Sequence, residues 1–343
     1  MGIQKLAFGK LPDGRSVERY TLEGAGGLTA AVLTYGATLQ SLRFRGKDLV
    51  LGFDDLDGYL HIKGSYQGAT IGRYGNRLAD GRFSLNGKAY DVGRNENGQG
   101  HLHGGENGFD KRLWTAVLAD GEEPAVAFSR RSADGEEGYP GNLDVTVTFT
   151  VTAGNALRIA YEARTDADTV VNLTNHAYFN LNGFDGGDIL DTELSIDADA
   201  ITPVDARLIP TGEQRPVEGT PFDFREAKPI GRDIDADDPQ LAIGGGYDHN
   251  FILNGTGMRP FATARSPRSG ITMTCATDQP GVQFYAGNAL AEDAGKGGKP
   301  LYRRQGFCLE TQHYPDSPNQ PSFPSTLLRA GESYRTVTEY RFR

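Results

Sequence analysis

Two ionisable side chains in this sequence, Glu310 and His176, lie where they could do acid–base chemistry. Glu310 belongs to a strand-like run in which alternation puts Phe307, Leu309 and Thr311 on one face and Cys308, Glu310 and Gln312 on the other. Four prolines in residues 315–324 then end the strand in a stiff loop. A carboxylate at a strand end beside a rigid loop is typical of a site. The same pattern also fits an edge strand with a solvated glutamate.

His176 lies in Val171-Asn-Leu-Thr-Asn-His-Ala-Tyr-Phe-Asn-Leu181. Alternation puts His176 on a polar face with Asn172, Thr174, Tyr178 and Asn180. A solvated face would carry Lys, Glu or Arg, and this face carries none. Uncharged donors and acceptors around one histidine suit the hydroxyl groups of a sugar, and histidine is an effective proton donor or acceptor near neutral pH.

Two further histidines, His101 and His103, are spaced i, i+2 in Gln99-Gly-His-Leu-His-Gly-Gly105. On a strand they would share one face and could bind a metal, with His176 and Glu310 as further ligands. The two glycines that follow would let the backbone approach a ligand closely.

Smaller polar groups complete the set of candidates. Asn76 and Arg77 follow one another in a glycine-punctuated loop, which is not a phosphate-binding fingerprint because no βαβ pattern surrounds it. Asp248 follows three glycines, and Gln283 points away from its apolar neighbours Val282 and Phe284.

The elements that must position these residues are predicted to be strands. Among 343 residues there are 46 glycines and 17 prolines, and a glycine share well above the usual ~7% is typical of many short strands. The pattern predicts one large all-β domain over residues 1–343, with short helices only near 54–61 and 233–240. The predicted strand pairs are 28–35 with 38–44, the two arms of 82–90 around Asn86-Gly87, 143–151 with 156–163, and 271–276 with 282–285; a last strand covers 334–342.

The overall charge points away from polyanionic partners. Asp and Glu number 45 against 35 Lys and Arg, and the basic residues are scattered, which argues against nucleic-acid and membrane partners. The N-terminal residues lack an apolar leader and no run is long enough to span a bilayer, so a cytoplasmic protein is predicted. Cys275 and Cys308 are expected to be buried thiols, with a single disulfide as the alternative.

Several of these motifs, in this order along the chain, closely resemble the aldose 1-epimerase (galactose mutarotase) family. The matching stretches are Gly68-Ala-Thr-Ile-Gly-Arg-Tyr-Gly-Asn-Arg-Leu78, Leu102-His-Gly-Gly105 with the segment 108–114, Asn172-Leu-Thr-Asn-His-Ala-Tyr-Phe-Asn-Leu181, the segment 202–212, Tyr247-Asp-His-Asn250 and Cys308-Leu-Glu-Thr-Gln-His-Tyr-Pro-Asp316. The resemblance implies a single β-supersandwich with a sugar-binding cleft and few short helices. It also implies a small aldose as substrate and no cofactor. No metal is expected at the site, and the protein is expected to be a monomer or homodimer.

The resemblance also implies a role for each candidate. Glu310 matches the general base at the C1 hydroxyl, His176 the general acid at the ring oxygen, and His103 a second histidine near that oxygen. The residues expected to bind the other hydroxyls are Asn76, Arg77, Asp248 and Gln283. His101 is expected at the surface or behind the site, and Ala177, where the family often has Ser, should point away from the cleft.

Three alternatives remain open from the sequence. They are a glycoside hydrolase that pairs Asp248 with Glu310, a metal-dependent isomerase built on the histidines and Glu310, and a sugar-binding protein without activity. For a mutarotase we expect a bell-shaped pH profile that falls in acid as Glu310 gains a proton and in base as His176 loses one, with a change between about pH 5 and 8.

Overall fold

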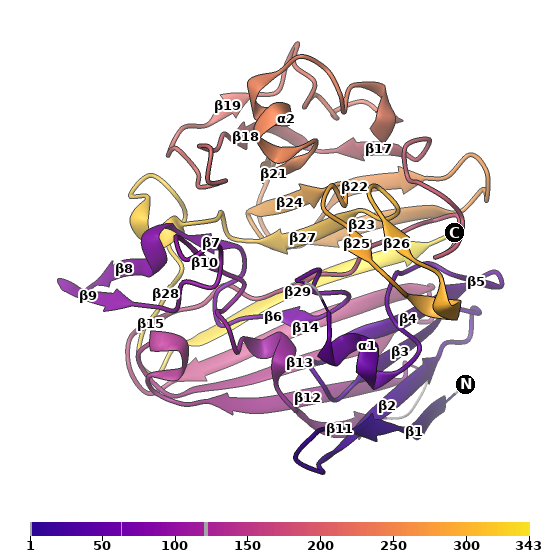
Figure 1. Cartoon of the computed structure of the whole chain (residues 1–343), viewed down its shortest axis with the longest axis horizontal. Coiled ribbons are helices and arrows are strands. Elements are labelled where there is room, and N and C mark those ends of the chain that lie inside the picture. Colours follow the sequence, from indigo (N-terminus) through magenta and orange to yellow (C-terminus); the bar gives the residue numbers. More distant parts are fainter. Residues whose placement is uncertain (1, 63, 120–122) are drawn as a thin grey trace.

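The protein is a stack of β-sheets, which confirms the all-β prediction (Figure 1). The computed structural model describes residues 2–62, 64–119 and 123–343. Its largest sheet has the strand order β11 (Thr115–Ala119), β12 (Ala125–Ser132), β13 (Leu143–Val151), β14 (Ala156–Thr165), β29 (Ser333–Phe342), β23 (Thr272–Thr277), β22 (Arg259–Arg265), β17 (Glu193–Ile196) and β20 (Lys228–Pro229).

Two smaller sheets pack against this large sheet. The N-terminal sheet has the order β1 (Gly2–Lys10), β2 (Ser16–Glu23), β3 (Thr29–Leu33), β4 (Thr38–Phe44) and β5 (Lys47–Asp48). The other, here named the site sheet, has the order β19 (Arg215–Pro216), β18 (Ala198–Thr202), β21 (Asp248–Leu253), β24 (Gly281–Tyr285) and β27 (Cys308–Gln312).

One continuous apolar core joins the three sheets. It includes Tyr20 from the N-terminal sheet, Phe128 and Phe149 from the large sheet, and Phe251 and Phe284 from the site sheet. Burying this apolar area is the main force that holds the layers together. The site sheet thereby keeps its outer face free for polar side chains.

Short ladders and helices fill the connections between the sheets. The ladders are β6 (Thr70–Ile71) with β16 (Thr174–Asn175), β7 (Arg77–Leu78) with β10 (His101–Leu102), β8 (Arg82–Leu85) with β9 (Lys88–Asp91), β15 (Thr169–Val170) with β28 (Leu327–Leu328), and β25 (Ala291–Glu292) with β26 (Leu301–Tyr302). The α-helices are α1 (Leu56–Leu60) and α2 (Pro239–Gly244). Single 3₁₀ turns are η1 (Ala79–Gly81), η2 (Phe109–Lys111), η3 (Glu136–Gly138), η4 (Ile230–Arg232), η5 (Lys296–Gly298) and η6 (Ser317–Asn319).

Most of the predicted strand pairs are confirmed. β3 pairs with β4 and β13 with β14, both antiparallel. The β8–β9 hairpin turns through Asn86 at φ 52° and Gly87 at φ 77°, the left-handed pair that a two-residue hairpin turn requires. Cys275 and Cys308 are buried and unpaired, as expected.

The prediction that residues 271–276 pair with 282–285 is wrong. β23 lies between β22 and β29 in the large sheet, whereas β24 lies between β21 and β27 in the site sheet. The chain changes sheets at Asp278, whose backbone N–H and carboxylate both bond Val337 of β29 before β24 begins. Alternation indicated two strands correctly, but it carries no information about which neighbours each strand takes.

The second predicted helix lies later than expected. Residues 233–238 form turns, and α2 begins at Pro239, because the Asp238 side chain accepts a hydrogen bond from the Gln240 N–H and Pro239 occupies the first helical position. The first helix, α1, falls inside the predicted range 54–61.

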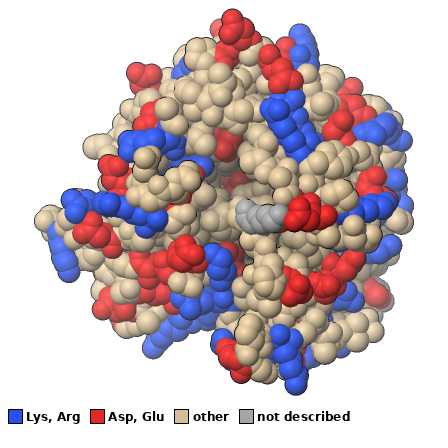
Figure 2. All heavy atoms as spheres, viewed as in Figure 1, with Lys and Arg blue, Asp and Glu red and all other residues tan. Residues whose placement is uncertain are grey.

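Acidic and basic side chains are interspersed over the face drawn in Figure 2, which is hollowed near its centre. Across residues 2–62, 64–119 and 123–343, none of the helices has the length and apolar character needed to cross a membrane.

Candidate active site

A polar cleft opens at the outer face of the site sheet. Its volume is ≈ 250 Å³, below the range of about 300–1,000 Å³ typical of sites for drug-sized ligands, which suits a single small molecule. Its lining combines strands of the site sheet with loops from the first third of the chain, the segment after β16 and connections near residues 208, 244 and 288. It comprises Gly64, Tyr66, Asn76, Arg77, Leu102, His103, His176, Tyr178, Leu208, Gly244, Asp248, Tyr285, Asn288, Ala289 and Glu310.

Glu310 lies in the middle of β27, with its side chain on the cleft face of the sheet. The residue is only 2% exposed, and Gln283 of β24 is its partner in the ladder. Its Oε2 atom has no hydrogen-bond partner among the described residues. Burial, reinforced by the Asp248 carboxylate, raises the pKa of Glu310 well above its usual value, while Arg77 acts in the opposite direction. Its raised pKa allows the carboxyl group to accept a proton as well as to release one.

His176 follows β16 and faces Glu310 across the cleft. Its Nε2 lies 3.6 Å from Oε1 of Glu310. Burial lowers the pKa of His176 to about 4, and its own backbone carbonyl opposes this shift. The ring is confined by Tyr178, Tyr66 and Tyr285, with ring centroids 5.0, 5.7 and 6.4 Å away. An acid–base pair therefore faces the cleft with fixed geometry.

His103 joins this pair from the opposite wall. Its ring centroid lies 5.1 Å from that of His176. Nδ1 of His103 accepts a hydrogen bond of 3.1 Å from the Asn76 backbone N–H, so the neutral ring carries its proton on Nε2. Burial lowers the pKa of His103 well below its usual value. Ligand-type atoms of His103, His176 and Glu310 all lie within 4.8 Å of one another.

Asn76 and Arg77 reach the cleft from a sharply turned segment. Asn76 has φ 64°, and its Oδ1 accepts a hydrogen bond from the Arg77 N–H. The Arg77 guanidinium forms a forked ion pair with Glu96, with Nη2 to Oε1 at 2.6 Å. Burial alone would lower the pKa of Arg77, but Asp248, Glu96 and Glu310 raise it. The group is a permanent cation held in one orientation.

Asp248 and Gln283 form a second polar wall. Nε2 of Gln283 donates to Oδ1 of Asp248 at 2.7 Å, and Oε1 of Gln283 has no partner among the described residues. Burial raises the pKa of Asp248, while Arg77 and Gln283 oppose the shift. Asp248 presents its carboxylate to the cleft, and Gln283, which is not part of the lining, holds one of its oxygens.

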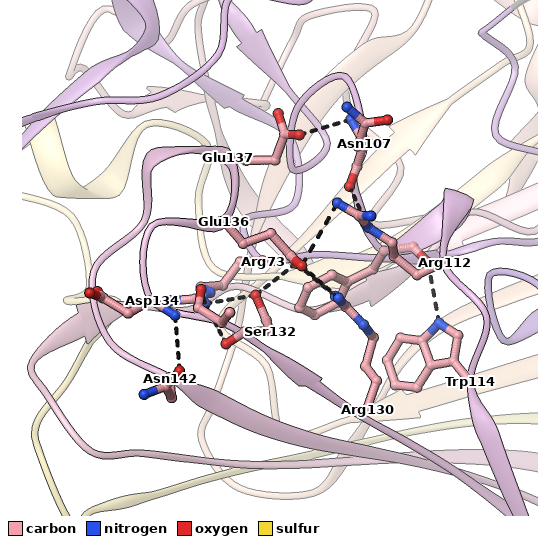
Figure 3. Close-up of polar contacts among 12 residues, drawn as sticks. Arg73, Asn107, Arg112, Trp114, Arg130, Ser132, Asp134, Glu136, Glu137 and Asn142 are labelled. Carbon is pink, nitrogen blue, oxygen red and sulfur yellow. Dashed lines mark hydrogen bonds and ion pairs between the residues drawn. The ribbon is translucent and has the colours of Figure 1, made fainter.

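A buried hydrogen-bond network anchors the loops that carry Asn76, Arg77 and His103 (Figure 3). Arg73 is 2% exposed, and its guanidinium donates to the backbone oxygens of residues 132, 133, 140 and 141 and to the Ser132 hydroxyl. Ser132 donates in turn to Glu136, which also pairs with Arg130 at 2.8 Å. Glu137 accepts the N–H groups of residues 106 and 107, which fixes the loop after His103.

The proline-rich loop that follows β27 supports the same segment. The Asp316 N–H donates to the Arg77 carbonyl at 2.9 Å, and its Oδ1 accepts the Ala79 N–H at 2.9 Å. Ser317 N–H donates to the Tyr74 hydroxyl. The loop therefore fixes the Arg77 segment and does not line the cleft.

All seven candidates from the sequence, namely Glu310, His176, His103, Asn76, Arg77, Asp248 and Gln283, converge at this site. Six line the cleft directly, and Gln283 contacts Asp248 and pairs with Glu310 in the ladder. Ala177 points into the apolar core, as expected.

The predicted pairing of His101 with His103 on one strand face is wrong. β10 ends at Leu102, and His103 has φ 52°, so alternation does not extend across it. His101 is fully buried and does not line the cleft, so the surface alternative expected for it is wrong, whereas a position behind the site is compatible with its burial. Its Nδ1 donates to the Gly93 carbonyl and its Nε2 accepts from the Tyr139 hydroxyl. The glycines after His103 were expected to let the backbone approach a ligand. At Gly104 the close approach is instead to the protein itself, since a Cβ there would overlap the Gly72 carbonyl.

The polar face predicted around His176 is only partly presented to the cleft. His176 and Tyr178 line it. The Asn172 amide instead donates to the backbone carbonyls of Gly75 and His313. The Asn180 amide donates to those of Gly187 and Gln305. Their amides satisfy buried backbone groups of neighbouring loops, which is the usual role of buried Asn.

Some cleft-related residues escaped the sequence-based reasoning, and four of them illustrate why. The Tyr66 ring lies against the rings of His103 and His176. Glu96 forms the ion pair with Arg77, and Leu208 and Asn288 line the cleft. Each lies in irregular backbone, where no periodicity indicates which way a side chain points. Tyr66 and Leu208 have positive φ, at 51° and 61°, which no sequence pattern signals for these residue types.

The pKa shifts change the expected pH dependence of any reaction that uses this pair. Burial lowers the pKa of His176 to about 4, so the Glu310–His176 pair resists taking up a second proton. Burial also raises the pKa of Glu310, so the pair resists losing its last proton. The pair therefore holds one proton over a wide range. We expect kcat/KM to vary less than about twofold between about pH 5 and 7. A titration midpoint near the ordinary histidine value of about 6.5 would contradict this.

Comparison with known proteins agrees with this geometry. The family model described as aldose 1-epimerase matches residues 18–341. A galactose mutarotase from Bos taurus is 45% identical, with 100% of this chain and 99% of the relative covered, and an aldose 1-epimerase from Escherichia coli is 38% identical, with 96% of each covered. A crystal structure of an aldose epimerase homologue from C. elegans has a TM-score of 0.86 at 33% identity, covering 94% of this chain and 98% of the other. The galactose 1-epimerase structure from Lactobacillus acidophilus has a TM-score of 0.88 at 29% identity, covering 99% and 98%. The chain belongs to the aldose 1-epimerase family.

Proposed function

We propose that this protein is a mutarotase, an isomerase that interconverts the α and β anomers of aldoses such as galactose and glucose. The observation that carries the proposal is the buried pair of Glu310 and His176, 3.6 Å apart, in a cleft of ≈ 250 Å³. Mutarotation needs one proton acceptor, one proton donor and a site for one sugar ring, and the cleft offers all three.

The reaction proceeds by ring opening and closure. In the reactive form of the pair, the single shared proton lies on Nε2 of His176. Nε2 gives that proton to the ring oxygen while the Glu310 carboxylate takes the proton of the C1 hydroxyl, and the C1–ring oxygen bond breaks. The open-chain aldehyde rotates about C1–C2 and exposes its other face. Ring closure then returns both protons, so the enzyme exchanges no net proton with water.

The remaining polar residues bind and orient the sugar. His103 presents Nε2–H toward the ring oxygen, beside His176. Arg77, Asn76 and Asp248 bind the other hydroxyls, and Gln283 contributes through its hydrogen bond to the Asp248 carboxylate. Holding the sugar in one orientation makes the proton transfers effectively intramolecular, which is a large part of the catalytic effect.

The direct test is polarimetry with pure single anomers of galactose, glucose, xylose and arabinose. We expect the optical rotation to reach its equilibrium value faster than in the uncatalysed control, equally fast in the presence of a chelator. Loss of activity with chelator would favour a metal-dependent isomerase. Release of reducing sugar from an oligosaccharide would favour a hydrolase, and binding without acceleration a sugar-binding protein.

We expect Arg77→Lys to weaken sugar binding more than it slows the chemical step. Lysine cannot hold both the forked pair with Glu96 and a hydroxyl of the ligand. The predicted result is a KM raised by about tenfold with kcat lowered by less than about threefold. Steady-state kinetics check it, and a reversed pattern would assign Arg77 to the chemical step.

We further propose that residues 1–343 act as one domain in the cytoplasm, as a monomer or homodimer. The proposed partner is a small aldose, without nucleic acid, membrane or cofactor. The two unpaired buried thiols, Cys275 and Cys308, suit a reducing compartment.

A further inference from the structure

A thiol lies against the nitrogen of His176 that the proposed reaction does not use. Sγ of Cys308 is 3.5 Å from Nδ1 of the His176 ring. Cys308 is fully buried, so this contact takes place away from solvent. Neither sugar binding nor the acid–base exchange described above gives this thiol a task.

The geometry of β27 places Cys308 and Glu310 on opposite ends of one imidazole. The two residues are spaced i, i+2, so they project from the same face of the strand. Cys308 reaches Nδ1 at 3.5 Å and Glu310 reaches Nε2 at 3.6 Å. A single strand therefore places one side chain beside each ring nitrogen of His176.

Proton exchange at one nitrogen requires the other to keep its own proton. When His176 gives up the Nε2 proton, the neutral ring must remain in the tautomer that carries hydrogen on Nδ1. A buried N–H needs an acceptor. The His176 carbonyl, which raises the pKa of its own ring, also accepts the Gly68 N–H at 2.9 Å, and the Cys308 sulfur lies beside Nδ1 as a further acceptor. Burial raises the pKa of the Cys308 thiol well above its usual value, so its sulfur is a neutral, weak acceptor.

We propose that Cys308 is a positioning residue: its sulfur accepts the Nδ1–H of His176 and keeps the proton on that nitrogen, so that Nε2 is the atom that exchanges a proton with the sugar. This inference rests on the proposed function, because it specifies how the proposed acid is oriented. A neutral sulfur also suits both charge states of the ring, since it accepts from Nδ1–H equally in the imidazolium and in the neutral form.

The first test needs no variant of Cys308. Nitrogen-15 NMR of histidine-labelled protein, with the His176 signals identified by comparison with His176→Gln, reports the protonation of each ring nitrogen. We expect Nδ1 of neutral His176 to show the shift of a protonated nitrogen. A bare Nδ1 with the proton on Nε2 would overturn the proposal.

The second test compares variants with a matched control. Cys308→Ala should lower kcat by about tenfold, leave KM within about twofold and give mixed tautomers at His176. Cys308→Ser should recover most of kcat, because a hydroxyl oxygen also accepts. Cys275→Ala removes the other fully buried thiol, which lies in the core of the large sheet, and should leave kcat and the His176 signals unchanged.

The outcomes separate this inference from the proposed function. If Cys308→Ala keeps both kcat and the Nδ1–H tautomer, the role of Cys308 is wrong while the mutarotase assignment stands. If His176→Gln keeps near wild-type activity, the assignment of the acid fails whatever the tautomer. Thermal melting of each variant shows whether a loss of kcat follows from a loss of folded protein.

Discussion

Replacing Glu310 by Gln should lower kcat for mutarotation by a factor of about 10²–10⁴, the usual contribution of a positioned general base. The amide keeps the shape of the carboxyl group but cannot accept the C1 hydroxyl proton. Because the cleft and its hydroxyl-binding residues remain, KM should change by less than about threefold. Polarimetry with single anomers measures the rate, and thermal melting verifies that the protein is folded.

Two companion variants make the Glu310 result specific. Glu310→Asp keeps the charge but withdraws the carboxylate by one methylene, and a displacement of about 1 Å can cost about 10²-fold in rate. Glu339→Gln makes the same carboxyl-to-amide change on β29, outside the cleft lining, and should leave kcat unchanged. Near wild-type activity of Glu310→Gln would rule out Glu310 as the base.

Replacing His176 by Gln should lower kcat by about 10²–10³, at the lower end of what general acid–base catalysis contributes. The loss should be incomplete, because Nε2–H of His103 lies close to the same part of the cleft and can still polarise the ring oxygen. The broad plateau of the pH profile should also disappear, since the second group of the proton-sharing pair is gone.

His103→Gln provides the comparison for His176. It should cost less than His176→Gln, because His103 orients the sugar, whereas Nε2 of His176 lies 3.6 Å from Oε1 of the proposed base Glu310. The double variant His103→Gln/His176→Gln should fall below either single variant, since residual catalysis after loss of His176 depends on His103. If His103→Gln were the more severe change, the two histidines would have exchanged roles.

The structure changes one functional expectation drawn from the sequence. Ordinary histidine chemistry predicted an activity change between about pH 5 and 8. Burial lowers the pKa of His176 to about 4 and raises that of Glu310, which widens the one-proton range of the pair. Desolvation depends on every element packed around the pair, and no local pattern encodes it.

The positions of His101 and His103 also depend on tertiary packing and not on the local sequence pattern. The i, i+2 spacing of His101 and His103 gave a consistent strand interpretation, yet only His103 faces the cleft. The positive φ of His103 and the partners of His101, Gly93 and Tyr139, separate the two rings. A backbone turn of this kind at a residue other than glycine is held by tertiary contacts, here by the paired hydrogen bonds with Asn76.

The sequence by itself determined the strands, the faces of Cys308 and Glu310, the candidate residues and the family resemblance, because strand facing is a local property of the backbone. Only the tertiary structure decided which strands are neighbours, which histidine meets Glu310, and that Cys308 lies against Nδ1 of His176. Those outcomes depend on how distant segments pack, and one ring nitrogen is distinguished from the other only by what lies beside it.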